Sequence, residues 1–256
     1  MKKALTILAI IAFAAAARAS SFEAAKYFAQ GNTAYTNQNY QEAVEFYKRS
    51  AAEGLRSPAL SYNLANAYYK SGDLGNAIAN YRKAELLDPR DPDCRANLNR
   101  ALSQTADSVS RKEVPAALRS FFFLYFYLGL KEQAVLALAF WVVFWLALSA
   151  LVLSKNGSFR RFMKKVSVAF LIVTLLFLGS ALFKYYDAAH QGVVTAETAR
   201  VHAGPDASYT EIFILHSGAE FKITGQEKGW CKLTVVSGEE ERQSGWVEES
   251  QIARIL

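Results

Sequence analysis

The sequence is poor in the side chains that most often carry out catalysis or hold metal ions. It has 3 histidines and 2 cysteines among 256 residues. His190, His202 and His216 have no cysteine or acidic residue at the spacing of a metal site. The sequence also lacks a glycine-rich phosphate loop and a serine nucleophile elbow. We therefore expect a protein that is not an enzyme and that binds neither a cofactor nor a metal.

The two cysteines, Cys94 and Cys231, stand in regions of different character and leave two possibilities open. In an oxidising compartment they could form a disulfide between domains. Single cysteines in small domains are more often buried apolar side chains. We expect the second arrangement.

Positive charge is concentrated in two short stretches, although the whole chain carries a net charge of +6. Three basic residues precede position 19, and five lie within 155–165. Elsewhere basic and acidic side chains are nearly balanced, or acidic ones are in excess. The charge therefore indicates membrane topology, and we expect no nucleic acid as a partner.

Two long runs contain no charged residue: Ala134–Leu153 and Val166–Phe183. At about 1.5 Å per helical residue, each can cross a hydrocarbon core of about 30 Å. We predict transmembrane helices over 134–153 and 166–183. The basic loop 155–165 between them is expected in the cytoplasm, because lysine and arginine near span ends resist translocation. The chain on both sides of the pair then lies outside the cytoplasm.

The N-terminus predicts the same topology. Two lysines precede an apolar stretch from Ala4 to Ala17, and small residues at positions 17 and 19 suit a signal peptidase. We predict a cleaved signal peptide over 1–19 and a mature chain that starts near Ser20. An uncleaved membrane anchor is the alternative.

Residues 24–105 repeat with a period of 34, which is typical of the tetratricopeptide repeat (TPR). Residues of the same type recur one period apart: Asn32 and Asn66, Tyr35 and Tyr69, Ala43 and Ala77, and Tyr47 and Tyr81. The resemblance predicts an all-α solenoid with repeats over 24–57 and 58–91 and a capping helix over 92–105.

The first helix of each repeat lines the concave face of such a stack, and this face is the expected protein-binding groove. Matched to the family pattern, the positions that face the groove are Phe28, Asn32, Tyr35, Tyr62, Asn66, Tyr69, Lys70 and Arg100, and Asn63 is expected beside them. Asparagine amides can hydrogen-bond an extended peptide, and the two cations can attract a carboxylate. Phe28 and Asp93 stand where carboxylate-clamp repeats carry lysine, so we predict peptide binding without specificity for a C-terminal carboxylate. Alternatively, the tyrosines only pack the repeats.

The segment 118–130 is rich in aromatic residues and too short to cross a membrane. Phenylalanine and tyrosine suit the membrane–water boundary. We therefore predict an interfacial segment. A docking strip for the transmembrane helix of a partner is the alternative.

From residue 191 to 256, short β-type runs alternate with turns, which predicts a small all-β barrel. This region resembles the bacterial SH3-like (SH3b) domain at Arg200-Val201 with Gly204-Pro205, Leu215 with Gly218, Gly229-Trp230 with Lys232, and Gly245-Trp246-Val247. The resemblance implies a cleft for peptidoglycan or wall peptides. We expect this cleft to contain Trp230 and Trp246, and Tyr209 and Phe213 from an exposed variable loop. Alternatively, the tryptophans pack the core or its rim.

The order of these parts resembles the BatE-type proteins of bacterial aerotolerance (Bat) operons. That resemblance implies companion membrane proteins with von Willebrand A domains and a MoxR-type AAA+ ATPase on the cytoplasmic side. It predicts a non-enzymatic scaffold, anchored by two passes in the bacterial inner (cytoplasmic) membrane, with both soluble domains on the periplasmic side. The rival hypothesis is a peptidoglycan-binding accessory or regulator of a murein enzyme.

Overall fold

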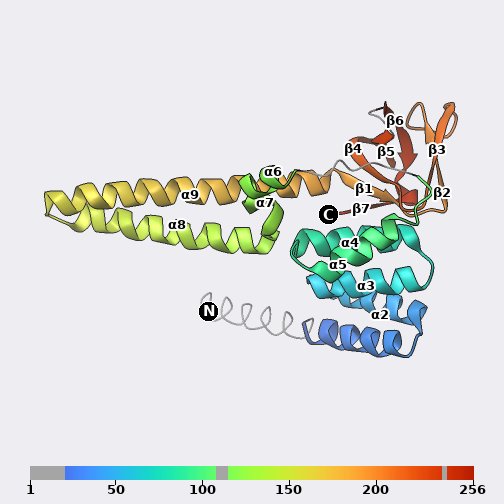
Figure 1. The fold of residues 1–256 in the computed structure, drawn as a ribbon, viewed down its shortest axis with the longest axis horizontal. Coiled ribbons are helices and arrows are strands. Elements are labelled where there is room, and N and C mark those ends of the chain that lie inside the picture. The colour runs from blue at the N-terminus through green and yellow to red at the C-terminus, as the bar shows by residue number, and fades with distance from the viewer. Residues whose placement is uncertain (1–20, 108–114, 238–240) are drawn as a thin grey trace, which may run out of the picture. The chain divides into compact units, whose positions relative to one another are not determined.

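The computed structural model describes residues 21–107, 115–237 and 241–256 (Figure 1). The predicted signal peptide over 1–19 lies outside these described residues. The chain divides into two compact units. Among the described residues, the repeat–sheet unit comprises 21–85, 92–107, 192–237 and 241–255. The hairpin unit comprises Leu86–Asp91, Arg111–Gln191 and Leu256.

The repeat–sheet unit begins with helices whose ends follow local sequence signals. They cover residues 21–36, α2 Tyr40–Ala52, α3 Pro58–Lys70, α4 Leu74–Leu87 and α5 Pro92–Leu102. At the start of α3, the Ser57 hydroxyl accepts a hydrogen bond from the Leu60 amide (3.1 Å), and Pro58 takes the first helical position. The helix ends before Gly72, whose φ of +86° is a left-handed value that favours glycine.

Residues one period apart have the same place in the helical core. Ala43 and Ala77 are fully buried, and Tyr47 and Tyr81 are each 1% exposed. Small side chains let the helices approach closely, and the tyrosine rings fill the space beside them. Gly31 lies so close to the Tyr47 ring that an added Cβ would overlap it. The sequence period is therefore also a period of packing.

The C-terminal part of the same unit is an antiparallel sheet. Its elements are β1 Gln191–Val194, β2 Thr198–His202, β3 Glu211–His216, β4 Glu220–Glu227, β5 Trp230–Ser237, β6 Glu241–Glu248, the short helix η1 Glu249–Gln251 and β7 Ile252–Arg254. The strand order is β3-β2-β6-β5-β4-β1-β7. Alternate side chains face the core: in β5, Cys231 and Leu233 are fully buried, and Trp230 and Lys232 lie on the other face.

The sheet also contacts helix α4 within the repeat–sheet unit. The Arg82 guanidinium donates to both carboxylate oxygens of Glu220 (2.6 and 2.9 Å) and to Glu85 (2.7 Å). The Arg82 side chain is only 9% exposed and that of Glu220 13%. Close by, the Gly75 amide donates to the Ser217 hydroxyl (3.0 Å). The repeats and the sheet therefore share an interface rather than a flexible connection alone.

The turn before β4 extends this interface. Gly218 has a φ of +89°, and a Cβ there would overlap Thr105 and Ile78. Two residues before Gly218, the backbone amide of His216 donates to the Asp107 carboxylate (2.6 Å). The same carboxylate lies 2.9 Å from His216 Nδ1. Glycine is required at position 218 by both its backbone conformation and the space available.

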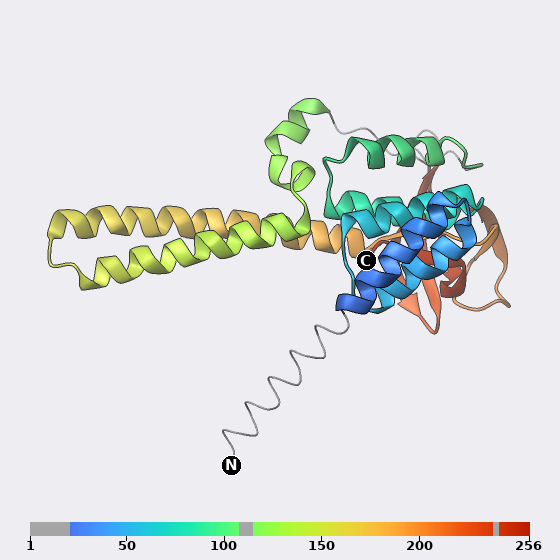
Figure 2. The same ribbon diagram turned by 90° about the horizontal axis from the view of Figure 1, so that it is seen from below.

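The hairpin unit contains two long apolar helices that run side by side in both views (Figures 1 and 2). They are α8 Leu130–Leu153 and α9 Gly157–Ala189, and they include the predicted spans 134–153 and 166–183. The Phe140 ring of α8 lies 5.8 Å from Phe170 and 5.4 Å from Phe177 of α9. Both helices are long and apolar enough to cross a membrane, and each contains an 18-residue stretch with a mean hydropathy of 2.6 in α8 and 2.5 in α9.

The basic segment 155–165 is mostly helical, where the sequence predicted a loop. Helix α9 begins at Gly157, and the Asn156 side chain accepts from the amides of Ser158 (2.9 Å) and Phe159 (3.1 Å). This N-cap stabilises the first helical turn. The connection between the two long helices is therefore only three residues, Ser154–Asn156.

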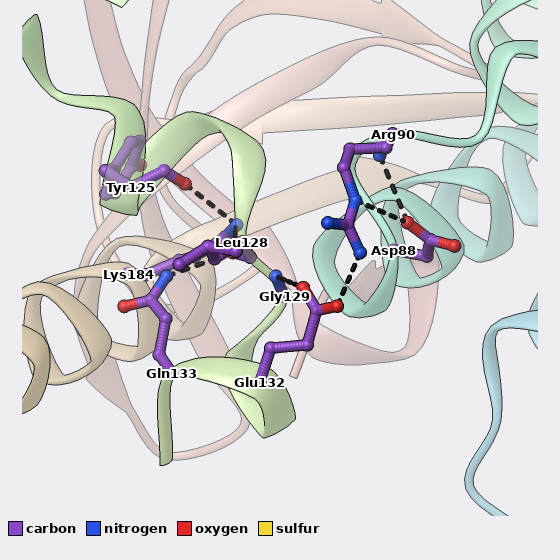
Figure 3. A network of polar contacts seen from close by, with 8 residues as sticks. All are labelled: Asp88, Arg90, Tyr125, Leu128, Gly129, Glu132, Gln133 and Lys184. Atoms are coloured by element: carbon purple, nitrogen blue, oxygen red, sulfur yellow. Dashed lines mark hydrogen bonds and ion pairs between the residues drawn. The ribbon is translucent and has the colours of Figure 1, made fainter. Parts of the chain in front are cut away.

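Two short helices precede α8 in the predicted interfacial segment, α6 Ala116–Phe121 and α7 Phe123–Tyr127. The start of α8 contacts the chain segment Leu86–Asp91 of the same unit. Arg90 forms an ion pair with Glu132 (Figure 3). Gly129 lies against the Leu87 carbonyl oxygen, where a Cβ would have no room.

Candidate functional site

The predicted groove has a polar pocket where the two repeats meet. Its volume is about 190 Å³, and it is lined by Asn32, Tyr35, Thr36, Tyr47, Asn63 and Asn66. The Asn32 Oδ1 atom accepts from the Tyr47 hydroxyl (2.8 Å) and from Asn63 Nδ2 (3.0 Å). Four of the predicted groove residues thus meet around one pocket.

The same hydrogen bonds recur one repeat later. Asn66 Oδ1 accepts from the Tyr81 hydroxyl (2.6 Å) and from Asn97 Nδ2 (3.2 Å). Asn97 Nδ2 also donates to the Tyr62 hydroxyl (2.9 Å). We did not predict Asn97 as a groove residue, although it follows Asn63 by one period and this period could have identified it.

The buried tyrosines fix the orientation of these asparagines. Burial raises the pKa of Tyr47 to about 12, and it also raises the pKa of Tyr81. Both phenols therefore stay protonated at physiological pH and donate to the side-chain oxygens of Asn32 and Asn66. The hydrogen bonds within the described residues use these oxygens, so the amide Nδ2 groups of Asn32 and Asn66 remain for a ligand.

The other predicted groove residues lie outside this pocket. Lys70 ends α3 and Arg100 is in the last turn of α5, both exposed. The Tyr69 hydroxyl accepts from Gln104 Nε2 (2.6 Å). Phe28 packs against the core, with its ring 5.8 Å from that of Tyr47. Phe28 is therefore a packing residue, and the two cations can only contact parts of a ligand beyond the pocket.

The sheet gathers aromatic and cationic side chains on the face opposite its core. Trp246 is the cross-strand neighbour of both His202 and Lys232. The rings of His202 and Trp230 meet edge to face with centroids 5.3 Å apart, and Lys232 Nζ lies 5.9 Å from the centre of the Trp246 ring. His202 and Lys232 thus join the predicted cleft residues. Alternate residues of a strand share one face of the sheet, and cations often lie over tryptophan rings. These two patterns could have indicated His202 and Lys232 from the sequence.

Tyr209 and Phe213 have different environments. Tyr209 is 51% exposed, its ring lies against Gly204, and its carbonyl accepts from His202 Nδ1 (2.9 Å). Phe213 was expected in an exposed loop, but it lies in β3 opposite Val201 and packs partly buried against the core. Phe213 and the buried Leu215 are two residues apart in β3 and therefore face the same side of the strand. Tyr209 extends the aromatic face, and Phe213 supports it from within.

The cysteines occupy separate cores rather than a disulfide between domains. Cys94 is 1% exposed and Cys231 is fully buried. Burial raises the pKa of the Cys231 thiol, so this side chain is an unreactive thiol at neutral pH.

Comparisons with known families identify both predicted soluble parts. Residues 65–105 match the family described as TPR repeat, and residues 197–252 match the family described as Bacterial SH3 domain. The predicted presence of TPR repeats and of a bacterial SH3 domain is therefore confirmed. Together with α8 and α9, they give an architecture of helical repeats, two apolar helices that indicate membrane insertion, and a C-terminal antiparallel sheet.

Two individual proteins are similar to part of this chain. A serine/threonine-protein phosphatase T from Aspergillus oryzae is 39% identical over 77 residues, which are 30% of this chain and 16% of the phosphatase. The chain thus spans about one sixth of that relative. A chain in the solved structure of the C. elegans SMG5-SMG7 complex matches with a TM-score of 0.31 and 16% identity. The match covers 67% of this chain and 49% of that one.

Proposed function

We propose that this chain is a non-enzymatic scaffold, anchored in the bacterial cytoplasmic membrane, whose repeats bind an extended segment of a partner protein. The pocket between the repeats carries this proposal. Asn32, Asn63 and Asn66 place amide groups around it at the repeat junction. An extended peptide offers alternating N–H and C=O groups, which asparagine side chains can pair with irrespective of the peptide sequence.

The charge distribution supports a topology with both soluble parts on the same side. The basic residues of 155–165 lie at the turn of the α8–α9 hairpin and would remain in the cytoplasm. The repeats and the sheet then both lie outside it, where the repeats form a solenoid and the sheet closes as an SH3-like barrel. The ion pair between Arg82 and Glu220 supports this same-side arrangement.

The order of the parts supports a place in a Bat-type envelope complex for stress tolerance. The partners implied are membrane proteins with von Willebrand A domains, which would offer an extended segment to the groove. The repeat and SH3 matches are consistent with protein binding in general.

A photo-crosslinking experiment tests the groove. A benzoylphenylalanine at Tyr35, inside the pocket, should crosslink to an envelope protein in living cells, whereas the same group at exposed Lys48 should not. The double variant Asn32→Asp, Asn66→Asp keeps the oxygen acceptors for the buried tyrosines but removes the amide donors. It should abolish the crosslink. A crosslink at Tyr35 that persists unchanged in this variant would contradict the proposed binding mode.

A second function is favoured by the aromatic face of the sheet. His202, Trp230 and Trp246 form a contiguous surface on the bacterial SH3 domain, which suits wall peptides or sugars. If the chain is a wall-binding accessory of a murein enzyme, the purified protein should sediment with sacculi. Trp230→Ala with Trp246→Ala should then remove this binding, and the Asn32 and Asn66 variants should not affect it.

A further inference from the structure

The first polar side chains beyond the two apolar runs are buried instead of exposed. Gln133 directly precedes the run of α8, and Lys184 directly follows that of α9. Gln133 is fully buried and Lys184 is 6% exposed. A buried lysine in an apolar helix is costly unless its ammonium group is hydrogen-bonded. Both side chains must therefore have partners close to the end of the spans.

These partners are carbonyl groups at the end of α7, in the aromatic segment (Figure 3). Lys184 Nζ donates to the carbonyls of Tyr125 (2.9 Å) and Leu128 (2.8 Å). Gln133 Nε2 donates to those of Leu124 (2.6 Å) and Leu128 (3.0 Å). The last carbonyls of a helix have no partner within it. A lysine and a glutamine from the two long helices thus satisfy three carbonyls of α7 and of the residue that follows it.

A side-chain contact adds to this attachment. The Tyr125 hydroxyl donates to Asp187 Oδ2 (2.8 Å), and its ring lies 5.6 Å from that of Phe183. The segment is therefore held to α9 on both sides of Lys184. Since Gln133 and Lys184 mark the points where both apolar runs end, α7 lies at the level where the hydrocarbon of a bilayer would end. The run Ala134–Leu153 has the length needed to cross about 30 Å of hydrocarbon below that level.

The opposite side of the segment exposes large apolar side chains. Leu118, Phe122, Phe123 and Tyr127 are 48, 53, 52 and 45% exposed. Left in water, such a patch would cost about 25 cal/mol for each Å² of apolar surface. Phe183, whose ring lies beside that of Tyr125 in the same segment, is also 63% exposed. The patch therefore continues the apolar surface of the spans.

We propose that residues 115–129 form a membrane cuff, which inserts Leu118, Phe122, Phe123 and Tyr127 into the boundary of the lipid leaflet at this end of the spans. Lys184 is the positioning residue that holds the cuff at this depth. Exposed Lys131, at the same end of α8, suits the lipid phosphates. The proposal rests on the membrane insertion of α8 and α9, which is part of the proposed function, and is independent of the groove.

Spin labelling of the full chain in lipid vesicles tests the cuff. Single nitroxides are placed at Phe123→Cys in the cuff, at Trp145→Cys on the exposed face of α8, and at Ser208→Cys in a water-exposed turn. Cys94 and Cys231 are buried, which limits background labelling. The collision rate with apolar oxygen is compared with that of a water-soluble nickel complex. The ratio at position 123 should lie between that at 145 and that at 208.

The other outcomes separate the cuff from membrane insertion. If the oxygen-to-nickel ratio at position 123 equals that at position 208 while position 145 lies in lipid, the cuff is wrong. Membrane insertion of α8 and α9 would still stand. An immobile label at 123 that neither reagent reaches would indicate a partner helix and overturn the lipid contact. A water-like ratio at 145 would overturn insertion and the cuff together.

A second variant tests the positioning role of Lys184. Lys184→Met keeps an unbranched apolar chain but removes the ammonium donors. The label at 123 should become more mobile and more accessible to the nickel complex, while that at 145 should not change. An unchanged label at 123 would overturn the role assigned to Lys184.

Discussion

Replacing Asn66 by alanine should destabilise the second repeat, even though Asn66 lines a binding pocket. Its Oδ1 atom accepts hydrogen bonds from Tyr81 and Asn97. The Tyr81 side chain is 1% exposed, so its hydroxyl has no water to replace the lost acceptor. A loss of binding in this variant would therefore not show by itself that Asn66 contacts the ligand.

The expected cost follows from the buried phenol. Leaving a buried donor without its acceptor costs about 1–3 kcal/mol. Because 1.4 kcal/mol is a factor of ten in an equilibrium constant, local opening of the repeat should become about 5- to 140-fold more frequent. Asn66→Asp keeps an oxygen for Tyr81 and should show a much smaller change. This pair of variants separates the structural role of Asn66 from its role towards a ligand.

Hydrogen–deuterium exchange of the full chain measures this effect locally. Amides of α3 and α4 should exchange faster in Asn66→Ala by the stated factor, and those of β5 and β6 should not change. Unchanged exchange in α3 and α4 would mean that the Asn66–Tyr81 hydrogen bond does not stabilise the repeat, and the repeated Asn–Tyr pairing would lose its proposed role.

Three further changes test other parts of the structure. Arg82→Ala removes the buried cation that faces Glu220 and should cost about 3–5 kcal/mol at the interface between α4 and the sheet. Exchange should then rise in residues 74–85 and 216–222, and exposed Arg49→Ala is the matched control. Gly218→Ala should loosen the same interface, because its φ is +89° and its Cβ would overlap Ile78; unaltered exchange there would contradict the packing. Since burial raises the pKa of Tyr47 from 10.0 to about 12, the folded state holds this proton more tightly than the unfolded state. The contribution of Tyr47 to the free energy of unfolding should be constant below pH 10 and decrease between pH 10 and 12. Unfolding followed by circular dichroism should show this decrease, and the Tyr47→Phe variant should show a smaller one.

The helical repeats could be predicted from the sequence because their packing repeats with the residues. Alanine at 43 and 77 and tyrosine at 47 and 81 have the same burial in both repeats. The two apolar helices could be predicted equally well, because a membrane span requires a long run of residues without a charged side chain. The helical start of α9 at Gly157 was missed, since the basic residues after it indicated topology but not backbone conformation.

The contacts between distant segments could not be predicted in this way. Arg82 and Glu220 are 138 positions apart, and each is an ordinary surface residue by local pattern. The Lys184 ammonium donates to the carbonyls of Tyr125 and Leu128, which are 59 and 56 positions away in the sequence. Phe213 was expected in an exposed loop, but it lies in β3, pairs with Val201 and faces the same side as the buried Leu215. In each case the deciding partner lies elsewhere in the chain.

The most direct test of the anchored scaffold is its topology in the membrane. Ser158 lies in the basic start of α9 and Ser208 in an exposed turn of the sheet region. In intact spheroplasts, a membrane-impermeant thiol reagent should label Ser208→Cys and leave Ser158→Cys protected until the membrane is permeabilised. Equal labelling of both positions before permeabilisation would contradict a two-pass anchor with the repeats and the sheet outside the cytoplasm.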